Sequence, residues 1–143
     1  MKKYFLGFLL LFLAAGTVWL WAETIIRPDA TSSDGLKVSR FSLRGDLTLK
    51  GKCTIVFQLT NTTDHDITFH PNYGVFVGAR LDETNIDFGH RAKGHVLPPG
   101  GHVNIKAPHR FDRRGVYVFW PAYHANGHWG PYKWNAITVT IQE

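Results

Sequence analysis

The sequence predicts an all-β protein in which seven or eight short strands form an antiparallel β-sandwich. Beyond residue 35 apolar side chains recur at every second position, which is the period of a half-buried strand. The segments between these runs, such as NTTDHD and LPPGG, are rich in residues that favour turns. No stretch after residue 35 shows a helical period over three turns. The expected strands are residues 38–43, 47–49, 53–59, 67–69, 75–81, 103–105, 116–122 and 137–141.

A long apolar segment precedes this region. Lys2 and Lys3 are followed by an uncharged run from Tyr4 to Ala22, which is long enough to cross a membrane as one helix. We expect residues 1–22 to form an N-terminal hydrophobic helix that anchors the chain, with the two lysines in the cytoplasm. The alternative is a signal peptide that is cleaved after Ala22 and releases the rest of the chain into the periplasm. The anchor residues expected in the membrane or at its surface are Phe5, Leu9, Phe12, Trp19 and Trp21.

The remainder divides into a linker and one domain. Residues 23–35 are polar and contain Pro28 and Gly35, so they predict a linker. Residues 36–143 have the length of a single domain.

Charge and cysteine content exclude several classes of function. The 143 residues carry a formal net charge of +5, of which Lys2 and Lys3 contribute two. Basic side chains are mixed with acidic ones, so nucleic acid is not an expected partner. Cys53 is the single cysteine, which excludes an intramolecular disulfide and a cysteine-rich metal site. Its position in an alternating strand predicts a buried thiol.

The sequence lacks the motifs of common enzyme classes. It contains no nucleophile elbow, no phosphate-binding loop and no HExxH pair. We therefore expect a protein that is not an enzyme.

The stretch FDRRGVYVFW resembles the corner of immunoglobulin-like domains in which a tyrosine hydroxyl bonds to the backbone upstream. Asp112, Gly115 and Tyr117 occupy the corresponding positions. With FQLTNTT and LPPGG, this stretch makes roughly residues 45–142 similar to bacterial extracytoplasmic immunoglobulin-like modules related to CARDB and fibronectin type III. The resemblance implies an immunoglobulin-like sandwich, in which apolar packing of Cys53 near Phe119 replaces the disulfide between the sheets.

The stretch YHANGHWGPYKW is crowded with aromatic residues. Exposed aromatic rings at a loop suit a protein partner, a carbohydrate or the membrane surface, because they contribute contact area at a low entropic cost. The alternative is a loop that folds over the end of the sandwich as a small core of its own. The candidate partner-binding residues are Tyr123, Trp129, Tyr132 and Trp134.

Histidines in the same stretch suggest an alternative metal site. Trp120 followed by Asn126-Gly127-His128 resembles the end of the CopC-type periplasmic copper carriers, which implies that His128 is a copper ligand. Under this alternative, copper or zinc would bind His124 and His128, together with His65 or His70. Otherwise we expect no cofactor, and the eight histidines of the chain are dispersed.

These observations lead to one functional hypothesis and one alternative. We expect a non-enzymatic, membrane-anchored β-sandwich that acts as an interaction or accessory subunit of a membrane protein complex. It would cross the inner membrane once and place its C-terminal domain in the periplasm, with the membrane and other protein subunits as partners. The alternative is a periplasmic copper-binding or zinc-binding module of the CopC-like type.

Overall fold

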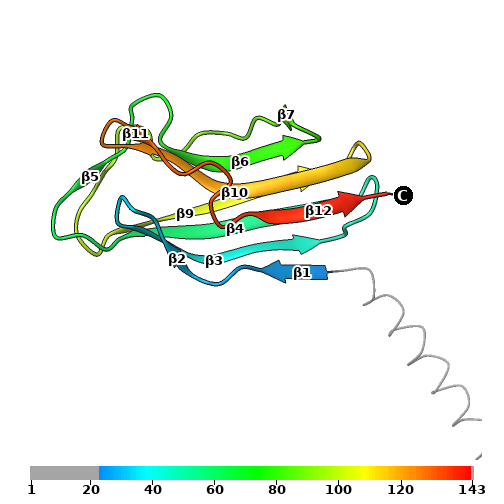
Figure 1. Ribbon diagram of the computed structural model, residues 1–143, viewed down its shortest axis with the longest axis horizontal. Helices are drawn as coiled ribbons and strands as arrows, with labels where there is room; N and C mark the ends of the chain where they lie inside the picture. Colours follow the sequence, from blue (N-terminus) through cyan, green and yellow to red (C-terminus); the bar gives the residue numbers. More distant parts are fainter. Residues whose placement is uncertain (1–22, 143) are drawn as a thin grey trace, which may run out of the picture.

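The computed structural model describes residues 23–142, which form an all-β fold of antiparallel strands (Figure 1). This described part contains no helix, and therefore none that is long and apolar enough to cross a membrane. The helix expected at residues 1–22, with its five anchor residues, lies outside the described part.

The first sheet pairs five strands in the order β1-β3-β4-β9, with β2 also paired to β3. Its strands are β1 (Glu23–Ile26), β2 (Ala30–Thr31), β3 (Leu36–Gly45), β4 (Lys52–Asn61) and β9 (His102–Arg110).

The second sheet is built around β10, which pairs with β6 along one side and with β12 and β11 along the other. A two-residue strand, β7, continues the sheet beyond β6. A short third sheet consists of β5 and β8. These strands are β5 (Ile67–Thr68), β6 (Val75–Leu81), β7 (Thr84–Asn85), β8 (Val96–Leu97), β10 (Gly115–Ala125), β11 (His128–Trp129) and β12 (Ile137–Ile141).

The core consists of alternate side chains of the two large sheets, as the period of two in the sequence predicts. In β4 the buried residues alternate with half-buried ones from Cys53 to Asn61. Phe41 of β3 and Phe57 of β4 meet edge to face, with ring centroids 6.0 Å apart. Cys53 is buried as expected, and burial raises the pKa of its thiol to about 11. The described residues thus form a sandwich-like all-β domain.

The tyrosine corner predicted from FDRRGVYVFW is present. The Tyr117 hydroxyl donates a hydrogen bond of 2.7 Å to the carbonyl oxygen of Arg113, four residues upstream. The ring is buried, and its centroid lies 4.9 Å from that of Phe111. This bond fixes the loop between β9 and β10 onto the end of the core. Cys53 and Phe119 belong to the same core.

Residues 47–49 do not form the expected strand, and this prediction was wrong. The Asp46 carboxylate accepts hydrogen bonds from the Thr48 amide and hydroxyl, and the Gly51 amide bonds back to the Thr48 carbonyl. These local bonds close a turn between β3 and β4, because a short polar side chain competes for backbone donors. Leu47 and Leu49 pack against the core from this turn, which explains their apolar alternation.

Residues 23–35 differ from the predicted linker because they contain β1 and β2. Glu23 pairs with Gly45, and the pairing continues along β3 as far as Ile26. The exposed edge of β3 supplies backbone partners for this segment, and Ile25 packs against the core. Glu23 is therefore already part of the first sheet.

We predict that Tyr117→Phe lowers the free energy of unfolding by about 1 kcal/mol, because it removes the buried hydroxyl's bond to the Arg113 carbonyl. The control is Tyr73→Phe, since Tyr73 is 39% exposed and its hydroxyl bonds to none of the described residues. Denaturant unfolding monitored by tryptophan fluorescence measures both. Equal midpoints for Tyr117→Phe and the unmodified protein would contradict a stabilising corner.

Candidate functional site

Six rings meet at the end of β10 where β11 pairs with it, and we call them the ring cluster. They come from the loop after β5, from β6, from the segment after β7 and from the β10–β11 hairpin. Neighbouring ring centroids in the cluster lie 4.3 to 6.3 Å apart. The ring cluster consists of His70, Tyr73, Phe76, His90, His124 and Trp129.

A tight hairpin places Trp129 in the cluster. Asn126 and Gly127 both have positive φ, of 50° and 81°, as a two-residue type I′ turn requires. This turn pairs His124 with Trp129 across the two strands. Their ring centroids lie 4.6 Å apart at an interplanar angle of 80°.

Backbone hydrogen bonds bring the loop after β5 to the same place. The His70 amide donates to the His124 carbonyl at 2.9 Å, and the His124 amide donates to the Gly74 carbonyl at 3.0 Å. The His70 ring lies 4.6 Å from the His124 ring by centroid. Tyr73 lies at 4.7 Å from both His70 and Trp129. The loop and the hairpin therefore form one continuous set of rings.

His90 extends the cluster over β6. Its Nδ1 donates to the Tyr73 carbonyl oxygen at 2.7 Å, which fixes the imidazole beside the loop. The His90 ring stacks on Phe76, with centroids 4.3 Å apart and planes inclined by 20°.

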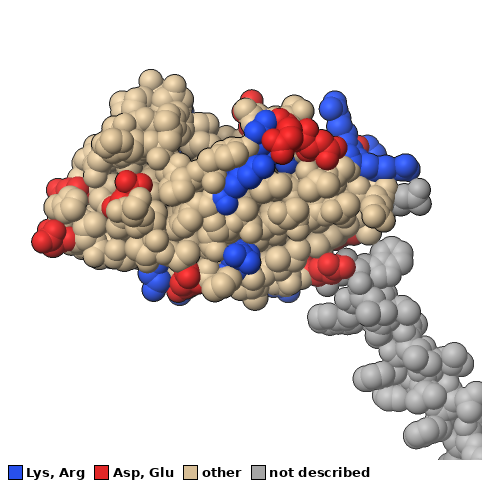
Figure 2. All heavy atoms as spheres, in the orientation of Figure 1, with Lys and Arg blue, Asp and Glu red and all other residues tan. Residues whose placement is uncertain are grey.

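The surface of the ring cluster is aromatic and largely uncharged. Trp129 is 55% exposed and Tyr73 is 39% exposed. Figure 2 shows no Lys, Arg, Asp or Glu over β11 and the adjoining loop on the face that it draws. Burial lowers the pKa of His124, and the positive charges of His70 and His128 lower it further. His124 is therefore neutral near pH 7, and the cluster presents rings with imidazole nitrogens between them.

The structure separates the four residues expected to bind a partner. Trp129 lies in the ring cluster, whereas Tyr132 lies elsewhere, 60% exposed, against Trp120 and Arg80. Trp134 is partly buried, and its ring meets that of Tyr123 edge to face at 6.2 Å.

Tyr123 is a core residue, which corrects its assignment to a contact surface. Its side chain is 1% exposed, and its hydroxyl lies 2.6 Å from Asp34 Oδ2 and 2.9 Å from Ser32 Oγ. Burial and the neighbouring Asp34 carboxylate raise the pKa of its phenol. Tyr123 therefore holds residues 32–34 onto the sandwich.

The histidines of the metal hypothesis are also separated. His124 lies beside His70, and His128 is exposed on β11. His65 lies apart, exposed, with its Nδ1 3.2 Å from the Asp64 carboxylate. Among residues 23–142 no three His, Cys, Asp or Glu side chains are grouped closely enough to hold a metal ion.

Sequence reasoning missed Tyr73, Phe76 and His90 as members of the site. HPNYGVF shows the aromatic character of Tyr73 and Phe76, but the pairings that bring these residues and His90 together at β10 are long-range. The Phe69–Ala125 and Val75–Arg91 bridges join segments that no local pattern connects. The Asn126-Gly127 pair was the available signal, because Asn-Gly between strands indicates a hairpin.

We predict that His70→Gln raises the pKa of His124, because it removes a neighbouring positive charge. The His124 pKa is lower in the folded state than its usual value of 6.5, so the unfolded state takes up a proton first as pH falls. The stability that the folded state has above pH 6.5 is therefore lost as pH falls from 6.5 through the folded pKa. The melting temperature of the unmodified protein should therefore fall with pH below 6.5, and less steeply in His70→Gln. NMR titration of the His124 imidazole measures the pKa directly. His65→Gln is the control, and an equal pKa in both variants would contradict the coupling.

The comparisons with known proteins show a similarity of fold alone. No family model matches the chain, and no curated protein matches it. Among solved structures, the chain is similar to the crystal structure of the C-terminal domain of Wzt, with 15% sequence identity and a TM-score of 0.51. The match covers 82% of this chain and 81% of that one. This similarity supports the all-β fold and carries no assignment of function at such low identity.

Proposed function

We propose that this protein is a non-enzymatic interaction subunit of a membrane protein complex, and that the ring cluster is its contact surface for a protein partner. Residues 4–22 hold the chain in the membrane, and the domain is an immunoglobulin-like module outside the cytoplasm. The tyrosine corner at Tyr117 supports the immunoglobulin-like assignment.

The exposed rings of the cluster carry this proposal. Trp129 and Tyr73 lie side by side, with a centroid separation of 4.7 Å, and both are open to solvent. Residues of this kind dominate the binding energy of protein interfaces, because they bury large areas and lose little conformational entropy. A soluble domain gains nothing from leaving an indole half exposed, whereas a partner that covers it removes apolar surface from water.

The position of the cluster supports the same function. β10 runs from Gly115 to Ala125, and the ring cluster lies at its Ala125 end. The described chain begins at Glu23, beside Gly45, at the opposite end of the domain (Figure 1). At about 3.3 Å per residue, β10 separates the two ends by roughly 30 Å. A domain attached at one end thus presents its rings at the other, away from the membrane.

We predict that Trp129→Ala abolishes the complex, because it removes the most exposed ring of the cluster. The full-length chain should stay in carbonate-washed membranes and run on a detergent native gel as an assembly larger than its own 16.2 kDa. Trp129→Ala should stay in the membrane but run as a smaller species. The control is Tyr132→Ala, which removes a ring of similar exposure outside the cluster and should leave the assembly intact.

The outcomes separate the two parts of this proposal. Extraction of the protein by carbonate would overturn membrane anchoring. Retention in the membrane without a larger assembly, or an assembly that Trp129→Ala leaves unchanged, would overturn the ring cluster as the contact surface.

Copper binding is the second candidate function, and the adjoining imidazoles of His70 and His124 favour it. The His70 and His124 rings adjoin at 4.6 Å, and His128 lies near enough for its charge to lower the His124 pKa. Neutral imidazole is a usual copper ligand. A rearrangement of the exposed His128 side chain would be needed to complete a site.

If copper is the ligand, Cu(II) should raise the melting temperature of the protein, because a ligand that binds the folded state stabilises it. His124→Ala and His128→Ala should each remove that rise. His102→Ala is the control, since it changes an exposed histidine on β9. An unchanged melting temperature on adding Cu(II) would exclude this function.

A further inference from the structure

The end of the domain that adjoins the apolar segment can be identified from strand pairing. Glu23 pairs with Gly45, Gly45 with Cys53, and Cys53 with His109, so these residues lie in one row across the first sheet, and Lys52 and Arg110 form the next pair along β4 and β9. The turn between β3 and β4 and the loop between β9 and β10 project from this row (Figure 1). We call this region the entry end.

The entry end carries a concentration of exposed cations. Figure 2 shows blue side chains at the end where the described chain begins, with acidic side chains among them. The cations lie on β3, on β4 and its preceding turn, at the end of β9 and on the loop between β9 and β10. The exposed cations of the entry end are Arg44, Lys50, Lys52, Arg110, Arg113 and Arg114.

The nearby carboxylates neutralise part of this charge. The Asp112 carboxylate forms ion pairs with two cations, with its Oδ1 3.6 Å from Lys50 Nζ and 3.3 Å from Arg110 Nε. One carboxylate is therefore shared by two cations and neutralises only one of the two positive charges. The Asp82 carboxylate lies in the same region and accepts a hydrogen bond of 2.8 Å from the Val116 amide.

Three cations of the entry end remain without an ion pair inside the part of the chain that the structure describes: Arg44, Lys52 and Arg113. Lys52 also lies directly opposite Arg110 in the pairing of β4 with β9. Like charges at directly opposed positions destabilise a sheet. An anionic surface against this end would remove that repulsion.

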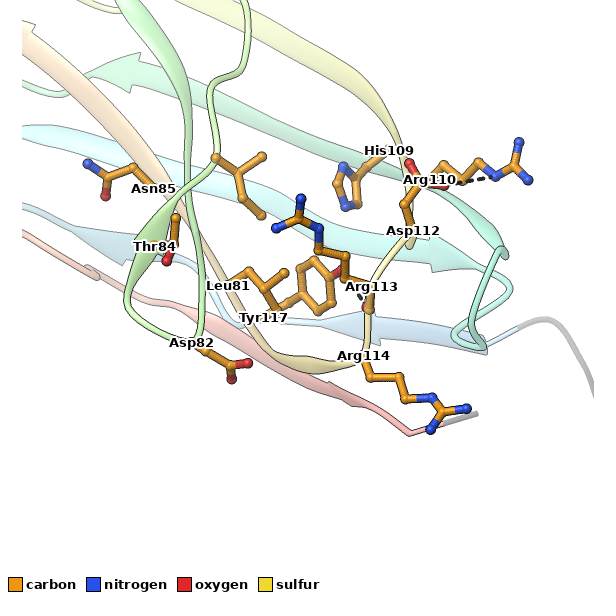
Figure 3. A pocket seen from close by; sticks show the side chains of 11 residues that line it. Leu81, Asp82, Thr84, Asn85, His109, Arg110, Asp112, Arg113, Arg114 and Tyr117 are labelled. Carbon is orange, nitrogen blue, oxygen red and sulfur yellow. Dashed lines mark hydrogen bonds and ion pairs between the residues drawn. The ribbon is translucent and has the colours of Figure 1, made fainter.

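A pocket of about 360 Å³ opens at the entry end, between the turn that joins β6 to β7 and the loop that joins β9 to β10. In Figure 3 the Arg113 side chain points into this pocket toward His109, whereas the side chains of Arg110 and Arg114 extend away from it. Arg113 thus places a guanidinium in a hollow, where a phosphate group could accept hydrogen bonds from it.

We propose that the entry end lies on the anionic phospholipid headgroups of the membrane that residues 4–22 enter, with a headgroup phosphate in the pocket beside Arg113. This inference rests on the membrane anchoring of the proposed function. Ala22 ends the apolar run and Glu23 is already paired in β1, so no spacer separates the two. Chain connectivity therefore brings the entry end to the headgroup region, and its unpaired cations match the charge found there.

The test uses the full-length chain in two kinds of vesicle, one of phosphatidylcholine alone and one that also contains phosphatidylglycerol. Hydrogen exchange of residues 46–51 and 111–115, measured by mass spectrometry, reports contact at the entry end. Exchange should slow several-fold in the anionic vesicles relative to the neutral ones, and high salt should reverse the change.

Two charge variants make the test specific. The double variant Lys52→Glu, Arg113→Glu should lose the slower exchange in anionic vesicles. The double variant Arg91→Glu, Lys93→Glu makes the same change of charge on exposed residues near the other end, and should keep it. Circular dichroism confirms that both variants are folded.

Each outcome decides the inference. Slower exchange that depends on phosphatidylglycerol and on the Lys52 and Arg113 charges supports it. Equal exchange in both vesicles, with the protein bound to both, overturns the headgroup contact and leaves membrane anchoring intact. Failure of the protein to sediment with neutral vesicles overturns anchoring and the inference together. Slower exchange on adding inorganic phosphate to neutral vesicles would show an anion pocket instead of a lipid contact.

Discussion

The burial of alternate side chains between the two large sheets is the constraint on which the other features of this domain depend. Each phenylalanine buried there contributes about 1.5–3 kcal/mol relative to an exposed one. Phe41, Phe57, Phe111 and Phe119 are all at most 2% exposed. Because the side chains of a strand alternate between its faces, this burial fixes which residues of every paired strand face outward.

β10 pairs with three other strands along its length and so extends this alternation from one end of the domain to the other. Its first half pairs with β12 as far as Phe119, and its last two residues pair with β11, so Pro121 lies where neither strand is its neighbour. A residue without an amide hydrogen is tolerated at such a gap. Trp120 lies on the outer face against Gly78, where even a Cβ atom would lie 2.3 Å from the indole. The strand therefore stays central although it contains a proline and a tryptophan.

The sequence allowed prediction of those features that depend on local pattern. Alternation identified most of the long strands, and the spacing of Asp112, Gly115 and Tyr117 identified the corner. The sequence pattern did not predict the ring cluster, because pairings between distant segments bring His70 to His124 and His90 to Phe76.

The linker expected at residues 23–35 and the surface position expected for Tyr123 were wrong for the same reason: the edge of β3 pairs with the segment before residue 36. The segment before residue 36 is polar, so its strands are stabilised by the backbone partners that β3 offers, and only Ile25 and Ala30 pack against the core. The same segment supplies Ser32 and Asp34, which accommodate the Tyr123 hydroxyl. With that segment assigned to a linker, Tyr123 had no partner and was expected at the surface.

The pairing of β1 also determines how the two ends of the domain are related. A linker of thirteen residues would let the domain tilt and would set no fixed distance between the apolar run and the ring cluster. Instead, Glu23 to Ile26 is hydrogen-bonded into the first sheet, and the sandwich core connects that sheet rigidly to β10. The distance between the ring cluster and the entry end is then the length of β10, and the fold keeps this distance constant. A partner that binds Trp129 would therefore be held at a defined distance from Glu23, the residue that follows the apolar run. The positive charges of the entry end would repel a second cationic surface and so oppose its contact with that end.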